Sequence, residues 1–361
     1  EGMQALFRFV DDLLARYDTD EFARYLLDRR LIHICPVANP DGYARNEATH
    51  PGGGGVWRKN ARDNDGDGVW FEPEDGVDLN RNFGFAWGYD DYGSSPSPTA
   101  ETYRGPSPFS EPETAAQRDL IAALRPATGL SFHAAGDYYM HSWGYVMKAT
   151  PDSAAFDEWD DEATLGSNYL AGPSSWALYP TNGDFNDWCY ADTLSKPRVF
   201  TWAPEVGLLT DGFWPVPSRI VPLADQALRK CYTVAALAGP YVRVGGFSLV
   251  EGTLDPGFPA RLQLRVRNMG REATPRRLVA TMVPLDPGVV VWPPDRKVPY
   301  PVVGPRASAT AIDDAFFLLA ADDTVTPGRT VRFEASFWAD STYFSRDTLS
   351  LRVGRPTVLT H

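Results

Sequence analysis

Cysteine is scarce in this chain of 361 residues, with only Cys35, Cys189 and Cys231. Three thiols cannot build a disulfide framework, so the fold has to be held together by apolar cores, although one pairing stays possible. Cys35 lies in the apolar run 31–37 and Cys231 lies in a helical pattern. We therefore expect both of these cysteines to be core residues.

Long apolar runs are missing as well. No stretch approaches the roughly 18–20 apolar residues that a membrane span needs, so we expect no transmembrane helix. The sequence shows no secretory leader pattern and does not begin with Met, which leads us to expect that upstream sequence has been lost.

Basic residues are few compared with acidic ones. The chain has 34 Lys and Arg against 47 Asp and Glu, a net charge of −13. Residues 1–240 hold 19 basic and 35 acidic residues, whereas residues 241–361 hold 15 and 12. Such an acidic first part disfavours nucleic acid and anionic membranes as partners, and solubility is the simpler interpretation of its charge.

Residues 1–240 alternate helical and strand patterns, which indicates a layered α/β domain. The patterns predict helices over residues 3–17, 111–124, 154–170 and 217–238, and strands over 31–37, 129–134 and 198–202. A turn is expected at Asn39–Gly42. The Gly- and Asp-rich region that follows, to about residue 110, has little periodicity, and loops of that length usually form a site.

The pattern changes after Gly239-Pro240. Short alternating strands separated by Pro- and Gly-rich turns are expected over residues 260–266, 277–283, 330–337 and 348–353. No long helical pattern follows. Residues 241–361 are therefore predicted to form an all-β immunoglobulin-like sandwich.

Several polar residues stand in the loops and at the strand ends of the first domain. Arg58 lies in one loop, Asn80 and Arg81 lie in another, and His133 and Glu205 close two expected strands. Each alone has an ordinary explanation, since buried arginines usually pair with carboxylates and a lone histidine is usually structural. Together they provide a metal ligand, a carboxylate base, and guanidinium groups for a carboxylate and an oxyanion. Peptide hydrolysis at a free C-terminus requires this set.

Seven motifs, in order, resemble the zinc carboxypeptidase family typified by pancreatic carboxypeptidases A and B. They are Pro36–Tyr43, Trp57–Asn60, Gly76–Phe83, Tyr103–Pro106 with Phe109–Glu113, Phe132-His133, Tyr179 with Asp187-Trp188, and Pro204–Gly207 with Gly212–Pro215. The resemblance covers residues 1 to about 240. It implies a three-layer α/β domain, in which a mixed sheet carries helices on both faces.

The resemblance also implies three catalytic roles. His133 matches the third zinc ligand, and Glu205 matches the general base that activates water and then protonates the leaving amine. Arg58 matches the residue that polarises the scissile carbonyl and stabilises the oxyanion.

Five further residues match the substrate-binding positions of the family. Asn80 and Arg81 match the pair that grips the terminal carboxylate, and Tyr179 matches the mobile tyrosine that closes over the bound residue. Asn186 takes the position that sets side-chain preference, and its amide favours neither apolar nor basic substrates. Asp184 nearby could supply negative charge, so basic or mixed preference stays open.

The zinc ligands depart from the family pattern. The first two come from a His-x-x-Glu motif, and this chain begins about two residues after the position of that Glu. His33 and His50 have no acidic partner at a suitable spacing, and His141 is expected to face solvent or the cleft rim. His133 alone should bind zinc poorly. Truncation is the favoured explanation, and the alternatives are natural loss of zinc or a remaining ligand at Glu1.

An acidic loop satisfies the calcium-loop pattern D-x-D-x-D-G-x5-E. Asp63, Asp65, Asp67 and Glu74 are its candidate oxygen ligands. The flanking segments show no helical periodicity, so it is not a true EF-hand. A calcium site and a solvated acidic loop both stay open.

Three functions are therefore considered. The first is a monomeric zinc-dependent exopeptidase acting on peptide or protein C-termini, extracellular or periplasmic and of bacterial origin, with this chain an inactive or weakly active fragment. The second is a catalytically dead relative that binds C-termini without zinc, which the presence of Arg58, Tyr179 and Glu205 disfavours. The third places the function in the β-sandwich as an adhesion or carbohydrate module. The sandwich sequence shows no conspicuous aromatic platform, so we expect a spacer or attachment domain instead.

Overall fold

The computed structural model describes residues 2–250, 252–275, 278–340 and 342–354. Residue contacts divide the chain into two compact units. The first unit comprises residues 1–15 and 32–235, and the second comprises residues 16–31 and 236–361. The segment 16–31, expected in the first domain, thus groups with the second unit by its contacts.

A four-stranded mixed sheet, with strand order β1-β4-β2-β3, lies at the centre of the first unit. Its strands are β1 (Thr128–Leu130), β2 (Tyr138–His141), β3 (Leu170–Pro173) and β4 (Phe200–Glu205). β1 runs parallel to β4 and β2 runs parallel to β3, whereas β2 and β4 are antiparallel. The expected strands near residues 130 and 200 are present with shifted bounds, while β2 and β3 were not anticipated.

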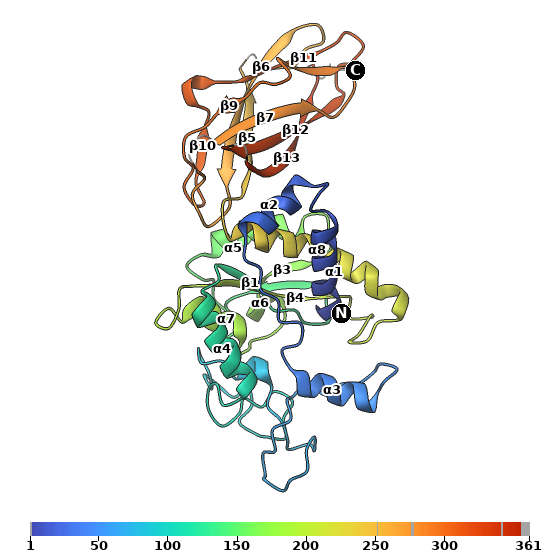
Figure 1. The fold of residues 1–361 in the computed structure, drawn as a ribbon, viewed down its shortest axis with the longest axis vertical. Helices are drawn as coiled ribbons and strands as arrows, with labels where there is room; N and C mark the ends of the chain where they lie inside the picture. The colour runs from blue at the N-terminus through green and yellow to red at the C-terminus, as the bar shows by residue number, and fades with distance from the viewer. Residues whose placement is uncertain (1, 251, 276–277, 341, 355–361) are drawn as a thin grey trace, which may run out of the picture. The chain divides into compact units, whose positions relative to one another are not determined.

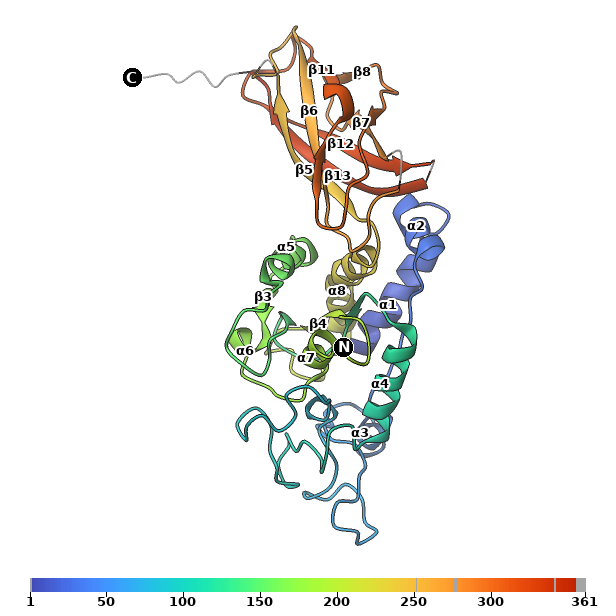
Figure 2. The ribbon, with the colours of Figure 1, turned by 90° about the vertical axis from the view of Figure 1, so that its left-hand side faces the viewer.

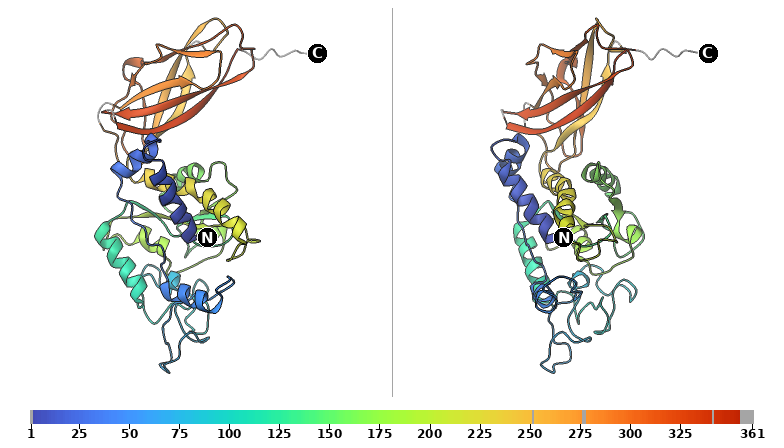
Figure 3. Two further views of the ribbon diagram at one scale, coloured as in Figure 1. Left: turned by 45° about the vertical axis from the view of Figure 1, so that its right-hand side comes forward. Right: turned by 90° about the vertical axis from the view of Figure 1, so that its right-hand side faces the viewer.

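Helices cover both faces of this sheet, with α1, α5 and α8 on one face and α4 and α7 on the other (Figures 1 and 2). The helices of the first unit are α1 (Gly2–Ala15), α3 (Pro40–Thr49), the short 3-10 helix η1 (Leu79–Arg81), α4 (Pro112–Leu124), α5 (Ser153–Thr164), α6 (Ser174–Ala177), α7 (Phe185–Ala191) and α8 (Pro217–Leu237). Figure 3 shows α1 against α8, where Ala5, Ala224 and Ala227 pack together with Phe132. The predicted layered α/β architecture is confirmed.

Aromatic side chains fill the layer between the sheet and α5. Phe200 and Trp202 of β4 contact Phe156 and Trp159 of α5 with ring centroids 5.0–5.9 Å apart. Each large aromatic buries roughly 150–250 Å² of surface, so this layer contributes much of the hydrophobic stabilisation of the unit.

His141 lies in this layer and not at the surface. Its side chain is 1% exposed, its ring stacks on Phe156 at 4.1 Å, and its Nε2 lies 3.3 Å from Asp160 Oδ2. Asp160 also accepts a hydrogen bond from Trp202 Nε1. The prediction that His141 faces solvent or the cleft rim was wrong, because α5 supplies a carboxylate and an aromatic ring that cover it.

The expected strand over residues 31–37 is also absent. A strand requires partners for its backbone N–H and C=O groups, and no described strand pairs with this segment. Leu31 is 83% exposed and Cys35 is exposed, so the prediction that Cys35 is a core residue was wrong. Cys231 is buried as expected, and the three cysteines are free thiols.

The expected turn at Asn39–Gly42 is the start of α3. The Asn39 side chain accepts a hydrogen bond from the Gly42 N–H, and Pro40 occupies the first turn of the helix. This is a typical N-terminal capping arrangement, since a capping side chain satisfies an N–H that has no partner within the helix.

The second unit contains α2 (Glu21–Arg29) and two antiparallel sheets. The first sheet has the order β10-β6-β11-β8 with β5 also paired to β6, and the second has the order β13-β12-β7-β9. The strands are β5 (Val242–Leu249), β6 (Pro259–Asn268), β7 (Leu278–Pro284), β8 (Val289–Trp292), β9 (Val298–Pro299), β10 (Ser308–Thr310), β11 (Phe317–Ala321), β12 (Thr330–Ala339) and β13 (Thr342–Arg352), with the short helix η2 (Ile312–Asp314) between β10 and β11.

Alternate residues of β6 and β12 are buried, as one-sided strands require. The antiparallel sheets agree with a β-sandwich, and the immunoglobulin-like topology stays a prediction. In the described part of the chain, no helix has the length and apolar character needed to cross a membrane.

Candidate active site

One pocket of the first unit brings together residues that are far apart in the sequence. Its lining includes the positions singled out for zinc, catalysis and substrate, which are Arg58, Asn80, Arg81, His133, Tyr179, Asp184, Asn186 and Glu205. Sequence reasoning had not singled out the remaining lining residues, which are Ser131, Met140, Ser174, Leu178, Thr181, Phe185 and Ala203.

Arg58 is held in place by a buried carboxylate. Its Nε donates to Asp78 Oδ2 at 2.8 Å, and the Asp78 side chain is 3% exposed. The Asp78 charge raises the pKa of Arg58, although burial acts in the opposite direction. Burial would raise the pKa of Asp78, but the guanidinium groups of Arg58 and Arg81 lower it below its ordinary value. The three groups therefore form one charged cluster.

The Asp78 carboxylate also caps the N-terminus of the short helix η1. Asp78 Oδ1 accepts from the Asn80 N–H at 3.0 Å, which caps the turn that carries Asn80 and Arg81. Asp78 was part of a quoted motif without a role of its own. Asp is a common capping residue, and its side chain usually accepts from the backbone N–H two or three positions later. Sequence could therefore have indicated the contact between Asp78 and the Asn80 N–H.

Arg81 is 2% exposed, yet its guanidinium lines the pocket. Its Nη1 donates to the Asn80 carbonyl at 2.8 Å, while its Nε has no hydrogen-bond partner among the described residues. Asn80 Oδ1 accepts from the Phe185 N–H, and its Nδ2 lies 3.5 Å from His133 Nε2. The pocket residues thus include N–H groups that could donate hydrogen bonds to an anion.

The loop after Tyr179 closely approaches η1. The Gly183 carbonyl accepts from the Phe83 N–H, and Gly183 has a φ of +67°. A Cβ at this position would lie 2.4 Å from the Arg81 carbonyl oxygen, so only glycine fits without displacement. This contact sets the distance between the Tyr179 loop and the arginines.

The central sheet brings His133 and Glu205 together. The His133 N–H donates to the Pro204 carbonyl at 2.8 Å, and the Val206 N–H donates to the His133 carbonyl at 2.9 Å. Glu205 ends β4 at this bridge. Burial and then the positive charge of Arg58 lower the pKa of His133 to about 4. His133 is therefore a neutral imidazole at neutral pH, the form that coordinates metals.

The described residues do not complete a zinc site around His133. Groups of three side chains that could hold a metal occur in the described part of the chain, but none of them includes His133. The proposed alternative ligand Glu1 lies outside the described residues. A zinc site needs three or four protein ligands, and one imidazole is not sufficient.

Two buried carboxylates lie beneath the Tyr179 loop at the start of α7. Asp184 accepts from the Asp187 N–H at 2.8 Å and from the Thr181 hydroxyl at 2.6 Å. Burial raises the pKa of Asp184, and burial together with the Asp184 charge raises that of Asp187 well above its ordinary value. Asn186 lies between them and is buried, and its Oδ1 has no hydrogen-bond partner in the described part of the structure.

The acidic loop is a separate cluster away from the pocket lining. One ligand oxygen from each of Asp63, Asp65 and Asp67 can be chosen within 4.8 Å of the others, and the same holds for Asp65, Glu72 and Glu74. The expected residues are thus in two overlapping groups that share Asp65. Glu72 was missed, because the pattern used for the prediction does not assign a ligand to its position.

Replacement of Asp78 by Asn tests the charged cluster. D78N keeps the capping oxygen but removes the charge. We expect a loss of about 2 kcal/mol in the free energy of unfolding, because partly exposed Arg58 loses its charge-assisted hydrogen bond to a buried carboxylate. Since the pKa of Asp78 is lowered in the folded state, its contribution is complete above the ordinary carboxyl pKa of about 4 and is lost at lower pH.

Urea unfolding followed by tryptophan fluorescence measures both effects. The difference between the parent chain and D78N should be largest above about pH 4 and narrow below it. The control is D91N, because Asp91 pairs with Arg104 but its side chain is 70% exposed. We expect D91N to change stability by less than about 0.5 kcal/mol. Equal effects of the two variants would contradict a special role for Asp78.

Comparison with known proteins agrees with this geometry. A model of the zinc carboxypeptidase family matches residues 1–230. A metallocarboxypeptidase A-like protein of Trichophyton verrucosum is 30% identical over 229 residues, which cover 60% of this chain and 51% of that protein. Carboxypeptidase B of Astacus astacus is 30% identical over 217 residues, which cover 56% of this chain and 66% of that protein. The chain spans about half to two thirds of the length of these relatives.

Solved structures give the same result. Bovine thrombin-activatable fibrinolysis inhibitor, in complex with tick carboxypeptidase inhibitor, matches with a TM-score of 0.54 and 25% identity, over 64% of this chain and 75% of that one. Another structure of thrombin-activatable fibrinolysis inhibitor matches with a TM-score of 0.56 and 26% identity, over 65% of this chain and 57% of that one. With the family model matching residues 1–230 of 361, the resemblance drawn from the motifs is confirmed, and this chain belongs to the zinc carboxypeptidase family.

Proposed function

We propose that this protein is an exopeptidase that grips the free C-terminal carboxylate of peptides and hydrolyses the last peptide bond. The observation that carries the proposal is the buried Arg81, whose Nε lacks a hydrogen-bond partner among the described residues and which lines the pocket beside Asn80. A buried N–H without an acceptor costs roughly 1–3 kcal/mol. A peptide carboxylate offers planar oxygen acceptors that suit a guanidinium, so its binding would remove this cost.

In this proposal, Arg58 stabilises the oxyanion and Glu205 transfers the proton, next to the carboxylate-binding pair Asn80 and Arg81. Arg58 is anchored through Nε by Asp78, which leaves its Nη groups to donate to the oxyanion that forms when water adds to the scissile carbonyl. Glu205 would accept a proton from that water and pass it to the nitrogen of the leaving amino acid, so the C–N bond breaks as the new amine is protonated. Tyr179 lines the pocket and is nearly half exposed, and in this proposal it would close over the bound residue.

The family implies zinc, of which His133 would be one ligand. Since no described group of three ligands contains His133, the steps above are assigned only to the protein's own residues. The alternative function is a relative that binds C-termini without hydrolysing them. Location outside the cytoplasm, bacterial origin and a monomeric state stay predictions of this proposal.

Hydrolysis can be tested with peptides that differ only at the C-terminus. The chain, and a form with whatever sequence its gene encodes ahead of Glu1, are incubated with a free-acid peptide and its amide, and products are read by mass spectrometry. We expect loss of one C-terminal residue from the acid, none from the amide, and inhibition by a zinc chelator. Binding of the acid without cleavage by either form would favour the alternative, and equal treatment of acid and amide would contradict both functions.

We also propose that the polar groups at the start of α7 favour a substrate with a basic C-terminal residue. Asn186 offers an unpartnered acceptor oxygen among the described residues, and burial raises the pKa of both Asp184 and Asp187, with the Asp184 charge adding to the shift at Asp187. A Lys or Arg side chain would donate hydrogen bonds and reduce the repulsion between these carboxylates. An aliphatic side chain would leave the acceptor without a partner.

The variant D184N tests this preference without removing the helix cap, because Asn also accepts the capping hydrogen bond. We expect the parent chain to bind a peptide ending in Lys more tightly than one ending in Leu, and D184N to reduce that ratio about tenfold. Affinities are measured by calorimetry. D152N is the control, since Asp152 pairs with Arg198 and does not line the pocket. A parent preference for Leu, or a ratio unchanged in D184N, would refute the assignment.

We also propose calcium as the ligand of the acidic loop. Oxygen atoms of Asp63, Asp65, Asp67, Glu72 and Glu74 form the two overlapping groups, and oxygen ligands are what calcium prefers. Burial and the charges of Asp67 and Glu74 raise the pKa of Glu72, as expected where carboxylates crowd without a cation. A bound cation would offset this repulsion.

Calcium binding predicts a stability increase that depends on Asp65, the residue shared by both groups. At a calcium concentration about 100 times the dissociation constant, the gain should be about 2.7 kcal/mol. Thermal unfolding with calcium and with a chelator measures it. D65N should abolish the gain, while D119N, at an exposed position on α4, should retain it. No calcium-dependent shift in the parent chain would leave the loop as a solvated acidic segment.

A further inference from the structure

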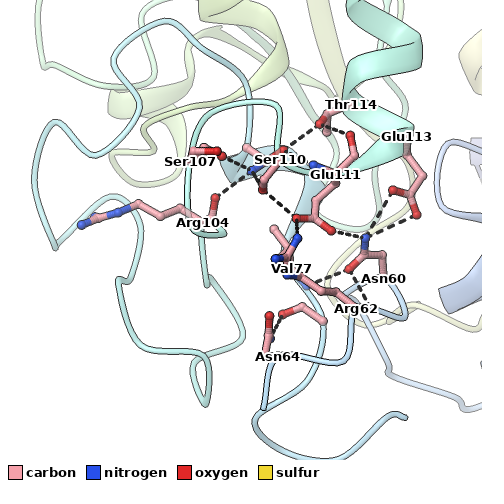
Figure 4. A network of polar contacts seen from close by, with 12 residues as sticks. Asn60, Arg62, Asn64, Val77, Arg104, Ser107, Ser110, Glu111, Glu113 and Thr114 are labelled. Atoms are coloured by element: carbon pink, nitrogen blue, oxygen red, sulfur yellow. Dashed lines mark hydrogen bonds and ion pairs between the residues drawn. The ribbon is translucent and has the colours of Figure 1, made fainter. Parts of the chain in front are cut away.

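Glu111 lies away from the pocket lining and is 1% exposed. It occupies the N-cap position of α4, yet its side chain makes no capping hydrogen bond to the helix. A buried carboxylate is costly unless it is paired and hydrogen-bonded, so its actual partners need an explanation. Figure 4 shows Glu111 among Asn60, Arg62 and Ser110.

The carboxylate of Glu111 contacts the Arg58 segment. Glu111 Oε2 accepts from Asn60 Nδ2 at 2.8 Å, and Oε1 accepts from Arg62 Nη1 at 3.1 Å. Asn60 Oδ1 in turn accepts from the Val77 N–H, the residue before Asp78. This side chain therefore fixes the loop that follows Arg58.

The backbone of Glu111 contacts the other segment. Its N–H donates to Asn82 Oδ1 at 3.3 Å, and Asn82 directly follows η1. Asn82 Nδ2 donates to the Arg104 carbonyl, the Ser107 carbonyl and Ser110 Oγ. Asn82 is fully buried, so its hydrogen bonds fix the end of the turn that carries the carboxylate grip.

The Ser110 hydroxyl connects the Asn82 side chain to the Glu111 carboxylate. Its Oγ accepts from Asn82 Nδ2 at 2.9 Å and donates to Glu111 Oε1 at 2.6 Å. Space here is so limited that a Cβ at Gly105 would lie 2.6 Å from Ser110 Oγ and 2.8 Å from Asn82 Nδ2. The connection between the segments therefore runs through tightly packed, well-defined hydrogen bonds.

We propose that Glu111 is a positioning residue that sets the spacing between Arg58 and the Asn80–Arg81 pair, and so tunes recognition of the substrate carboxylate. The proposal rests on the function proposed above, since it assumes that these side chains bind a peptide C-terminus. Asp78 fixes the Arg58 side chain and the Asn80 N–H, whereas Glu111, at the start of α4, contacts the segments that follow Arg58 and Arg81.

The chain offers a matched control on the same helix. Glu113 also accepts from Asn60 Nδ2, at 3.3 and 3.4 Å, but none of its described hydrogen bonds reaches Asn82. E113Q thus also replaces a carboxylate that accepts from Asn60, but it leaves the hydrogen bond between Glu111 and Asn82 unchanged. E111Q replaces one acceptor oxygen by an NH2 group, which cannot satisfy both Asn60 and Arg62 as the carboxylate does.

The experiment measures the dissociation constants of a fluorescent tripeptide and of its C-terminal amide for the parent chain, E111Q and E113Q. The readout is the amide-to-acid ratio, because a variant that merely lowers the folded fraction weakens both peptides equally and leaves the ratio unchanged. We expect the parent to prefer the acid by about 10- to 100-fold, E111Q to reduce that ratio about tenfold, and E113Q to stay within about twofold of the parent.

The variant S110A keeps the test decisive if E111Q does not fold. It removes the hydroxyl that joins Asn82 to Glu111, and we expect the ratio to fall about threefold. A parent-like ratio in the folded variants would overturn the positioning role while leaving the proposed function intact. Absence of acid preference in the parent chain would overturn the proposed function, and this inference with it.

Discussion

Three side chains of the pocket depend on one buried negative charge, the carboxylate of Asp78. It accepts from Arg58 Nε, caps the turn of Asn80, and lies close enough to Arg81 for both guanidinium charges to lower its pKa. Without this carboxylate, the buried guanidinium of Arg81 and the partly exposed guanidinium of Arg58 would repel each other. With it, donors for an oxyanion and for a carboxylate are held at a fixed spacing before any peptide arrives. Such preorganisation is the main source of electrostatic stabilisation in enzymes.

The pocket residues are held in place in two different ways, by backbone pairing at the edge of the sheet and by side-chain hydrogen bonds in the loops. The central sheet supplies His133 and Glu205, whose backbones are bonded where β4 ends. The irregular segments supply Arg58 and Arg81, and their positions depend on side-chain hydrogen bonds to the start of α4. A sheet edge fixes groups through regular backbone pairing, whereas loops need buried polar side chains such as Asn82 to do the same. Asn60, Asn82 and Glu111 are buried polar side chains of this kind.

Sequence alone identified the amphipathic helices α1, α4 and α8, because their apolar spacing is local. Through motif order it also identified part of the pocket lining, including Arg58, His133 and Glu205. It failed where structure depends on distant partners. The run 31–37 has strand composition but no described partner strand, and His141 is buried by Asp160, which lies in another element. The residue type does not reveal that Asp78 pairs with Arg58 or that Glu111 contacts Asn60 and Arg62. Glu72 joins the acidic cluster just after Phe71, whose positive φ of 69° no pattern indicated.

The central claim is that this pocket recognises a peptide by its terminal carboxylate. A crystal structure of the chain with a bound tripeptide ending in Lys tests it without depending on catalysis. The account predicts the terminal carboxylate within about 2.7–3.2 Å of donors on Asn80 and Arg81, with the last peptide carbonyl facing Arg58 and the Lys side chain near Asp184. A peptide bound with its carboxylate in solvent, or with an internal residue in the pocket, would contradict the account.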